Sequence, residues 1–374
     1  MLLRGKQRNQ EHTKETMKSR PFFLDFILKE WLLAASAVGL VLTSVYARRF
    51  PSFSSKEFQV IFILAALFVS AKGLERSGLI RRLSLHFERG RFVALKLVLV
   101  TFFLSMVVTN DIALIVIVPL TLAINTRRKG IVVILEALAA NAGSALTPFG
   151  NPQNLYIYWV YNVRATEFVS TIAPFSILFL ILLVAVSFLV KTSSESPVAE
   201  TEGLKISFTA VIYLILLTIL VLTVLHILPV FAGIVVFLYA FLFDRNSLKI
   251  DFSLILTFVF FFGLANNLQF LIPFSMSHSG HIFLFSSLLS QVISNVPAAL
   301  LIAKYTNQWQ ALLWGTNVGG FGSLVGSFAN LIAYKLYITH DSTNNTASFT
   351  LKFISLGISA FFIASALYFI LYGI

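Results

Sequence analysis

Polar residues interrupt otherwise apolar sequence at four places, and their types are those that bind small ions. Thr109-Asn110-Asp111 and Ser294-Asn295-Val296 each separate two apolar runs, and residues 141–158 and 317–334 combine glycines with asparagines and hydroxyl residues. Amide and hydroxyl oxygens are hard ligands, which suit Na+ better than a transition metal. The candidate ligands for a substrate or ion are Thr109, Asn110, Asp111, Asn141, Ser144, Thr147, Asn151, Asn154, Ser294, Asn295, Thr316, Asn317, Ser323 and Asn330.

Asp111 is the acidic member of this set. An acid surrounded by apolar sequence is costly inside a membrane unless it is paired, protonated or bound to a cation. Aspartate is also a preferred residue at the start of a helix, so a capping role is the alternative, and the two roles are compatible. Val296 occupies the corresponding place in the second triplet, which predicts one charged and one neutral site. We expect no cofactor other than a bound Na+, with ligands from Thr109, Asn110, Asp111, Ser144 and Asn154.

Glu136 is a second candidate titrating group, because it precedes Asn141 by little more than one helical turn. The basic cluster at residues 127–129 lies about two turns before it, so an interfacial ion pair is the alternative.

Other chemistries have little support in the sequence. The chain has no cysteine, and its six histidines never fall in a zinc-binding spacing such as H-E-x-x-H. A single deep aspartate without an evident partner argues against an intramembrane protease. No phosphate-binding loop of the form G-x-x-x-x-G-K-[ST] occurs, which argues against ATP-driven pumping. We therefore expect no enzymatic activity and no nucleic-acid partner.

The composition places these residues in a lipid bilayer. Of the 374 residues, 57% are hydrophobic and 12% are charged, against about 45–50% and about 25% in soluble domains. A membrane-spanning helix needs about 20 mostly apolar residues. This rule predicts an all-helical, multi-pass integral membrane protein, with the cell membrane as its location. The uninterrupted candidate spans are 31–47, 58–71, 168–190, 206–226, 229–243, 252–270 and 351–371.

The two triplets predict re-entrant hairpins, and the two glycine-rich segments predict broken helices. Polar backbone at membrane depth is tolerated only where it lines a cavity or is buried in protein. We therefore expect hairpins at about 92–125 and 281–304, and discontinuous helices at about 130–161 and 308–337. Unwound carbonyl groups can coordinate a cation, whereas N–H groups at the start of a half-helix favour an anion.

Charge distribution predicts the orientation of the chain. With a cytoplasmic N-terminus, 22 of the 28 Lys and Arg residues lie on the cytoplasmic side, as the positive-inside rule requires. The first hairpin then enters from the cytoplasm and the second from the opposite face. The predicted divisions are a basic cytoplasmic tail (1–30), a first half (31–190), a linker with a connecting helix (191–228) and a second half (229–374).

An internal repeat relates the two halves. Residues 141–158 align without a gap with residues 317–334, and each copy is preceded by a hairpin with an asparagine at its tip. Small residues also occur where membrane helices pack closely, which is the alternative reading of the glycines. Two copies in opposite orientations instead favour a secondary transporter built from inverted repeats. The identities are Asn141/Asn317, Gly143/Gly319, Gly150/Gly326, Asn154/Asn330, Leu155/Leu331 and Tyr158/Tyr334.

The motifs Thr-Asn-Asp (109–111), Asn-Pro-Gln-Asn (151–154) and Ser-Asn-Val-Pro (294–297), with the segment 317–334, resemble those of the ion transporter superfamily. That group includes citrate-transporter-like proteins, arsenite permeases, sodium/proton antiporters and divalent anion/sodium symporters. The resemblance extends from about residue 58 onward. It implies elevator-type movement of a hairpin-containing domain against scaffold helices, here 31–47 and 229–243, in a homodimer.

The hairpin tips depart from one branch of that superfamily. In the divalent-anion branch both tips read Ser-Asn-Thr, whereas here Asp111 and Val296 follow the tip asparagines. An acid after the tip asparagine is more similar to the arsenite-permease and antiporter branches, which implies coupling to protons or sodium.

The sequence thus predicts a secondary active transporter for a small inorganic or carboxylate anion, coupled to Na+ or H+. The alternative is a Na+/H+ antiporter in which Asp111 binds the two ions in turn. A passive channel is a further alternative, because broken helices also build selectivity filters.

Overall fold

The structure is a computed structural model that describes residues 30–79, 82, 90–123, 128–190, 193–194, 207–340 and 346–373. The predicted basic tail lies outside the described residues except for Glu30, as does most of the predicted linker between residues 191 and 206.

Helices account for nearly all of the regular structure in the described residues. In hydrocarbon every backbone N–H and C=O needs a partner within the protein, and a helix supplies these partners within one segment. Four described helical segments are long and apolar enough to cross a membrane: Ser55–Arg76, Ala165–Leu189, Arg245–Leu271 and Thr346–Tyr372. The prediction of an all-helical, multi-pass membrane protein is confirmed. The small exception is a two-residue antiparallel pair, β1 (Gly90–Arg91) with β2 (Ser193–Ser194).

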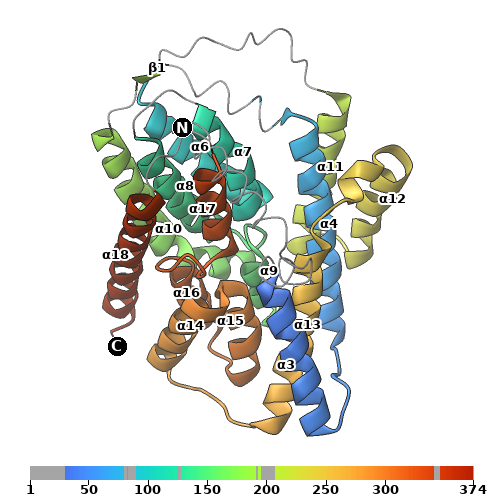
Figure 1. The fold of residues 1–374 in the computed structure, drawn as a ribbon. Coiled ribbons are helices and arrows are strands. Elements are labelled where there is room, and N and C mark those ends of the chain that lie inside the picture. Colours follow the sequence, from blue (N-terminus) through green and yellow to red (C-terminus); the bar gives the residue numbers. More distant parts are fainter. Residues whose placement is uncertain are drawn as a thin grey trace, which may run out of the picture.

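The helices form two groups that lie side by side (Figure 1). In the first group, α13 packs on α3, while α11 and α12 pack on α4. We call this the α4 group. Its members are α3 (Trp31–Ala47), α4 (Ser55–Arg76), α11 (Phe208–Val224), η1 (Val230–Gly233), α12 (Ile234–Phe243), η2 (Arg245–Leu248) and α13 (Phe252–Leu271).

The second group contains both triplets and both glycine-rich segments, and we call it the α8 group. Its members in the first part of the chain are α6 (Val93–Val108), α7 (Asn110–Ala123), α8 (Lys129–Ser144), α9 (Pro152–Val160) and α10 (Ala165–Leu189). Its later members are α14 (Ser279–Ile293), α15 (Asn295–Ile302), η3 (Ala303–Tyr305), α16 (Trp309–Gly319), α17 (Phe328–Ile338) and α18 (Thr346–Tyr372). Figure 1 places α9 and α15 toward the α4 group, where α9 contacts α4 and α15 contacts α13.

Helix α8 lies at the centre of its group. Every residue from 132 to 144 is buried, and α6, α7, α10, α17 and α18 all pack against it. The helix approaches α6 very closely at Gly143, where a Cβ atom would lie 2.1 Å from the carbonyl oxygen of Phe102. At the equivalent position in the second half, a Cβ on Gly319 would lie 2.5 Å from the Cβ of Ser290 on α14. Only glycine fits at either crossing.

Sharp bends separate the helices at both triplets. Thr109, between α6 and α7, has φ 96°, and Ser294, between α14 and α15, has φ 75°. Positive φ is strained for a residue with a side chain and costs on the order of 1–3 kcal/mol, so the surrounding structure must hold it. Each bend lets one helix end and the next begin without a connecting loop.

Candidate functional site

Four asparagine side chains join the two glycine-rich segments in a crossed pattern. Asn141 Nδ2 donates to Asn330 Oδ1 at 2.9 Å, and Asn317 Nδ2 donates to Asn154 Oδ1 at 2.8 Å. Because Asn141 aligns with Asn317 and Asn154 with Asn330, the two bonds are equivalent and reciprocal. All four residues are buried.

Two of these asparagines, Asn154 and Asn330, also donate to backbone carbonyls where a helix ends. Asn154 Nδ2 lies within 3.3 Å of the carbonyl oxygens of Ser144, Ala145 and Thr147, just after α8. Asn330 Nδ2 lies at 2.9 and 3.1 Å from those of Gly320 and Ser323, just after α16. The last carbonyls of a helix lack intrahelical partners, so these amides replace the missing donors.

The remaining amide hydrogens of the other two asparagines bond within their own helices. Asn141 Nδ2 donates to the carbonyl of Ala137 at 3.0 Å, and Asn317 Nδ2 donates to that of Leu313 at 2.8 Å. Thus all four crossed asparagines have acceptors for both of their amide hydrogens. Their oxygens keep lone pairs for a cation, but their nitrogens have no donor left for an anion.

The two hairpin tips dock on the broken segments by matching hydrogen bonds. The backbone N–H of Asn110 donates to Gly150 O at 3.2 Å, and that of Asn295 donates to Gly326 O at 3.0 Å. The hydroxyls behave alike, because Thr147 donates to Met106 O at 2.8 Å and Ser323 donates to Gln291 O at 3.0 Å.

The tip side chains are less alike. Asn110 Nδ2 donates to Asn141 Oδ1 at 3.2 Å, which joins the first tip to the crossed asparagines. At the second tip, Ser294 Oγ lies 3.4 Å from Asn295 Oδ1. The threonine at the first tip, Thr109, is 4% exposed, and its hydroxyl has no partner among the described residues.

Asn151 and Ser144 complete the network on the first half. Asn151 Oδ1 accepts the backbone N–H of Asn154 and thereby caps α9, while its Nδ2 donates to Ser144 Oγ at 3.2 Å. Thr316 has a different role, because its hydroxyl donates to carbonyls of its own helix at Leu312 and Leu313. The structure therefore connects Asn110, Asn141, Ser144, Asn151, Asn154, Asn317 and Asn330, and leaves Thr316 outside this network.

Asp111 faces a different environment from the asparagines. Its carboxylate has no hydrogen-bond partner among the described residues, and its Oδ1 is shielded from solvent. Asp111 and Thr109 line a cavity of about 170 Å³ between α7 and α17 on one side and α4 and α13 on the other. Since the carboxylate caps no backbone N–H, the capping role that the sequence allowed lacks support in this geometry. The cavity also contains charged side chains from Lys72, Glu75, Lys249 and Asp251.

Glu136 lies inside the α8 group and, in the described part of the chain, lacks the ion pair that the sequence allowed. It is fully buried on α8, and its Oε1 accepts the hydroxyl of Thr121 on α7. It forms no ion pair within the described residues, which do not include Arg127.

Gln153 is a buried polar residue that the sequence motifs did not predict as part of the site. This side chain is 1% exposed, and neither its Nε2 nor its Oε1 has a partner in the described part of the chain. The only sequence signal is its place between Asn151 and Asn154 at the start of α9.

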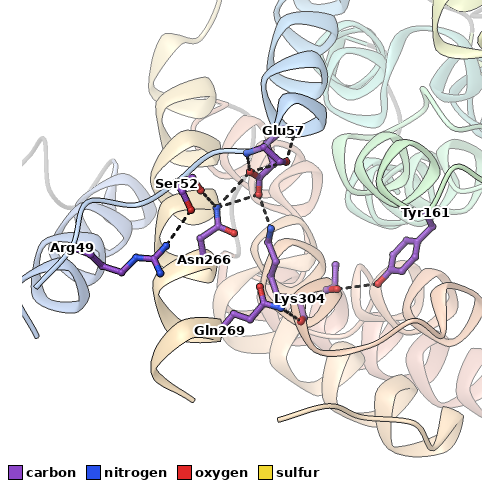
Figure 2. A network of polar contacts seen from close by, with 9 residues as sticks. Arg49, Ser52, Glu57, Tyr161, Asn266, Gln269 and Lys304 are labelled. Atoms are coloured by element: carbon purple, nitrogen blue, oxygen red, sulfur yellow. Dashed lines mark hydrogen bonds and ion pairs between the residues drawn. The ribbon is translucent and has the colours of Figure 1, made fainter. Parts of the chain in front are cut away.

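A buried ion pair between the two helix groups was also not predicted. Lys304 Nζ, in η3, lies 2.7 Å from Glu57 Oε1 on α4, and Glu57 is 1% exposed. Figure 2 shows the surrounding network, in which Asn266 Nδ2 donates to Glu57 and, at 2.6 Å, to Ser52 O. The Ser54-x-x-Glu57 capping box before an apolar run predicts the helix start, but it carries no information on the partner Lys304.

Further contacts in Figure 2 strengthen this junction on the side of the α8 group. Tyr161 donates its hydroxyl to the carbonyl oxygens of Thr306 at 2.8 Å and Ala303 at 3.1 Å. Gln269 on α13 donates to the carbonyl oxygen of Lys304 at 2.8 Å. The end of the second hairpin is therefore held by α4, α13 and the segment that follows α9.

Comparisons with known proteins find one family model and two relatives. A family model described as citrate transporter matches residues 24–319. The chain is 33% identical over 295 residues to a protein of Methanocaldococcus jannaschii described as an uncharacterized transporter, with 75% of this chain and 81% of the relative covered. It is 34% identical over 306 residues to the inner membrane protein YbiR of Escherichia coli, with 75% and 80% covered.

Proposed function

Because this chain belongs to the citrate transporter family, we propose that it is a secondary active transporter that moves a small inorganic or carboxylate anion, coupled to Na+ or H+. Membership of the family establishes a membrane transporter, and its relatives are likewise described as a transporter and a membrane protein. The observation that carries the finer proposal is the unpaired Asp111 carboxylate, which lines a cavity at the tip of the first hairpin.

We place the coupling cation at the first hairpin tip. Thr109 and Asp111 both line the cavity and both have unused polar atoms. The amide oxygen of Asn110 bonds to the Asp111 N–H at 3.0 Å and keeps a lone pair. Ser144 and Asn154 belong to the adjoining network and complete the proposed Na+ ligands. An uncompensated carboxylate in an apolar environment is costly, and a bound cation or proton removes that cost.

An elevator mechanism fits the division into two helix groups. The α8 group contains both hairpins and both broken segments, so it is the proposed moving part, and the α4 group is the proposed scaffold. The matching bonds of Asn110 and Asn295, and of Asn141 and Asn317, support two repeats related by inversion. Such repeats allow the site to open to the two sides of the membrane in turn.

The proposed orientation has a cytoplasmic N-terminus in the cell membrane. Cations assigned to the outer side gather at one junction, where Lys304 pairs with Glu57 and Lys56 donates to Val160 O. Cations assigned to the cytoplasm, Lys72 and Lys249, line the Asp111 cavity. The proposed homodimer would be formed by the α4 group, as the scaffold of each copy.

A Na+/H+ antiporter is the second candidate function. It is favoured by the same carboxylate, because Asp111 could bind Na+ and H+ in turn with no anion involved. A passive channel has less support, since hydrogen bonds between the crossed asparagines join the two described broken segments directly.

Flux measurements in proteoliposomes test the proposal. Uptake of radiolabelled citrate and phosphate is measured under imposed Na+ and pH gradients, for wild type, Asp111→Asn and Asp251→Asn. We expect gradient-dependent uptake of at least one anion, lost in Asp111→Asn and retained in Asp251→Asn, which lines the same cavity. Na+-driven proton movement without anion uptake would instead establish the antiporter. Anion flux that depends on neither the Na+ gradient nor the pH gradient, and that shows no counterflow, would indicate a channel.

A further inference from the structure

Unpaired polar atoms are distributed unequally between equivalent positions of the two halves. At the hairpin tips, the Thr109 hydroxyl has no partner, whereas the equivalent Ser294 contacts Asn295. One residue further on, Asp111 carries an unpaired carboxylate where the second half has Val296. In the broken segments, Gln153 aligns with Ala329. At all three positions the polar group without a hydrogen-bond partner lies in the first half.

Gln153 differs from the other described side chains in how many of its polar atoms lack a partner. It is the one described residue for which both polar side-chain atoms are buried and unpaired. A buried polar group without a partner is destabilising, and such a group in a native structure calls for an explanation. The neighbouring asparagines do not share this property, because their amide hydrogens already have acceptors.

The backbone at Gln153 also has a free donor. Pro152, the first residue of α9, has no N–H, and the N–H of Asn154 is bonded to Asn151 Oδ1. The N–H of Gln153 has no acceptor among the described residues. Helix N-terminal N–H groups attract anions. This N–H and the Gln153 Nε2 are two unpaired donors of the same residue. The side-chain Oε1 adds an unused acceptor.

We propose that Gln153 is a specificity-determining residue that binds the transported anion and selects anions that also carry a hydroxyl or a protonated oxygen. An anionic oxygen accepts from Nε2 and from the backbone N–H, while Oε1 accepts the hydroxyl of the ligand. This inference rests on the proposed anion transport. In the structure α9 contacts α4, α15 and α16. The proposal therefore requires that ligand access to Gln153 opens during the proposed movement of the α8 group relative to α4.

The preference for a ligand with a hydroxyl follows from the need of Gln153 Oε1 for a hydrogen-bond donor. A ligand without a donor would leave Oε1 buried and unpaired, whereas a ligand with a hydroxyl satisfies it. Sites that bind a substrate hydroxyl discriminate strongly against the analogue that lacks it. We expect wild type to prefer citrate over tricarballylate, its analogue without the hydroxyl, by at least about tenfold, which corresponds to about 1.4 kcal/mol.

The test compares Gln153→Met with Gln310→Met in the full-length protein in detergent. Met is close in size to Gln but has no amide, and Gln310 is an exposed glutamine on α16 that serves as the control. Tm is measured against rising concentrations of citrate, tricarballylate, hydrogen phosphate and sulfate, because a ligand that binds the folded state raises Tm. We expect Gln153→Met to weaken citrate binding about tenfold and to lose the preference for the hydroxyl. Gln310→Met should behave as wild type.

The stability of the ligand-free protein gives a second readout. Removing an unpaired amide should leave the Tm of ligand-free Gln153→Met unchanged or higher. A fall of several degrees, or a failure to fold, would show that the protein itself uses this amide and would overturn the inference. Wild-type affinity and preference in Gln153→Met would overturn it while leaving anion transport intact. If none of the four anions binds to or is transported by wild type, the proposed function fails, and the assignment of an anion to Gln153 fails with it.

Discussion

The ammonium nitrogen of Lys304 lies 2.7 Å from Oε1 of Glu57, which joins the end of the second hairpin to α4 in the other helix group. The carboxylate is also held by the backbone N–H of Ser54 at 2.6 Å. Glu57 is 1% exposed, so the pair is largely removed from solvent on the carboxylate side. The shortest ion pair of the described residues therefore crosses the junction between the two groups.

Lys304→Met should lower the stability of the protein, because it leaves the buried Glu57 carboxylate without its cation. Breaking one partner of a buried pair costs about 3–5 kcal/mol. The double variant Glu57→Gln with Lys304→Met should recover part of this loss. Thermal unfolding in detergent measures all variants. The matched control is Arg164→Met, which breaks an exposed pair with Glu167 at 3.9 Å. Equal effects of Lys304→Met and Arg164→Met would contradict the prediction.

Asn154→Leu should destabilise the protein by about 3 kcal/mol, since it removes the amide donor shared by three carbonyls at the end of α8 and the acceptor of one of the two amide hydrogens of Asn317. Asn307→Leu, at an exposed asparagine, is the control and should change stability little. A double-mutant cycle between Asn154 and Asn317 should give a coupling energy of at least about 0.5 kcal/mol. Additive effects in that cycle would argue against the crossed bond.

Gly143→Ala should disrupt the contact between α8 and α6, because the added Cβ would lie 2.1 Å from the backbone oxygen of Phe102. A backbone atom cannot rotate away as a side chain can, so we expect a loss of about 1–3 kcal/mol or more. Gly39→Ala is the control, since its Cβ meets only the flexible end of Leu264 at 3.2 Å. Comparison of the two Tm values decides the matter, and a smaller loss at Gly143 than at Gly39 would refute the close crossing.

The sequence indicates local breaks well but not the partners of polar groups. Glycines and polar triplets are poor continuations of an apolar helix, and the structure has helix ends at Thr109 and Ser294. The partner of Glu57 is 247 positions away, and no local pattern identifies it. Whether Gln153 is paired depends on what α4, α15 and α16 present to it, which only their packing determines. Residue types thus mark where polar groups lie, and the tertiary arrangement decides which of them remain available.

Asp111→Asn should abolish stabilisation of the protein by Na+. The amide preserves the size of the side chain but removes the negative charge. The other proposed ligands are neutral: Thr109, Asn110, Ser144 and Asn154. In wild type, Na+ at a hundredfold excess over its Kd should stabilise the folded protein by about 2.7 kcal/mol, because only the folded state holds the site. The measurement is Tm against NaCl, with choline chloride at equal ionic strength to separate specific binding from screening. Asp251→Asn is the matched control: it removes a carboxylate from the same cavity, and that carboxylate already caps α13 through the Leu254 N–H at 3.2 Å. If the Na+-dependent rise in Tm persists in Asp111→Asn but disappears in Asp251→Asn, the cation site lies at the start of α13 and not at the hairpin tip.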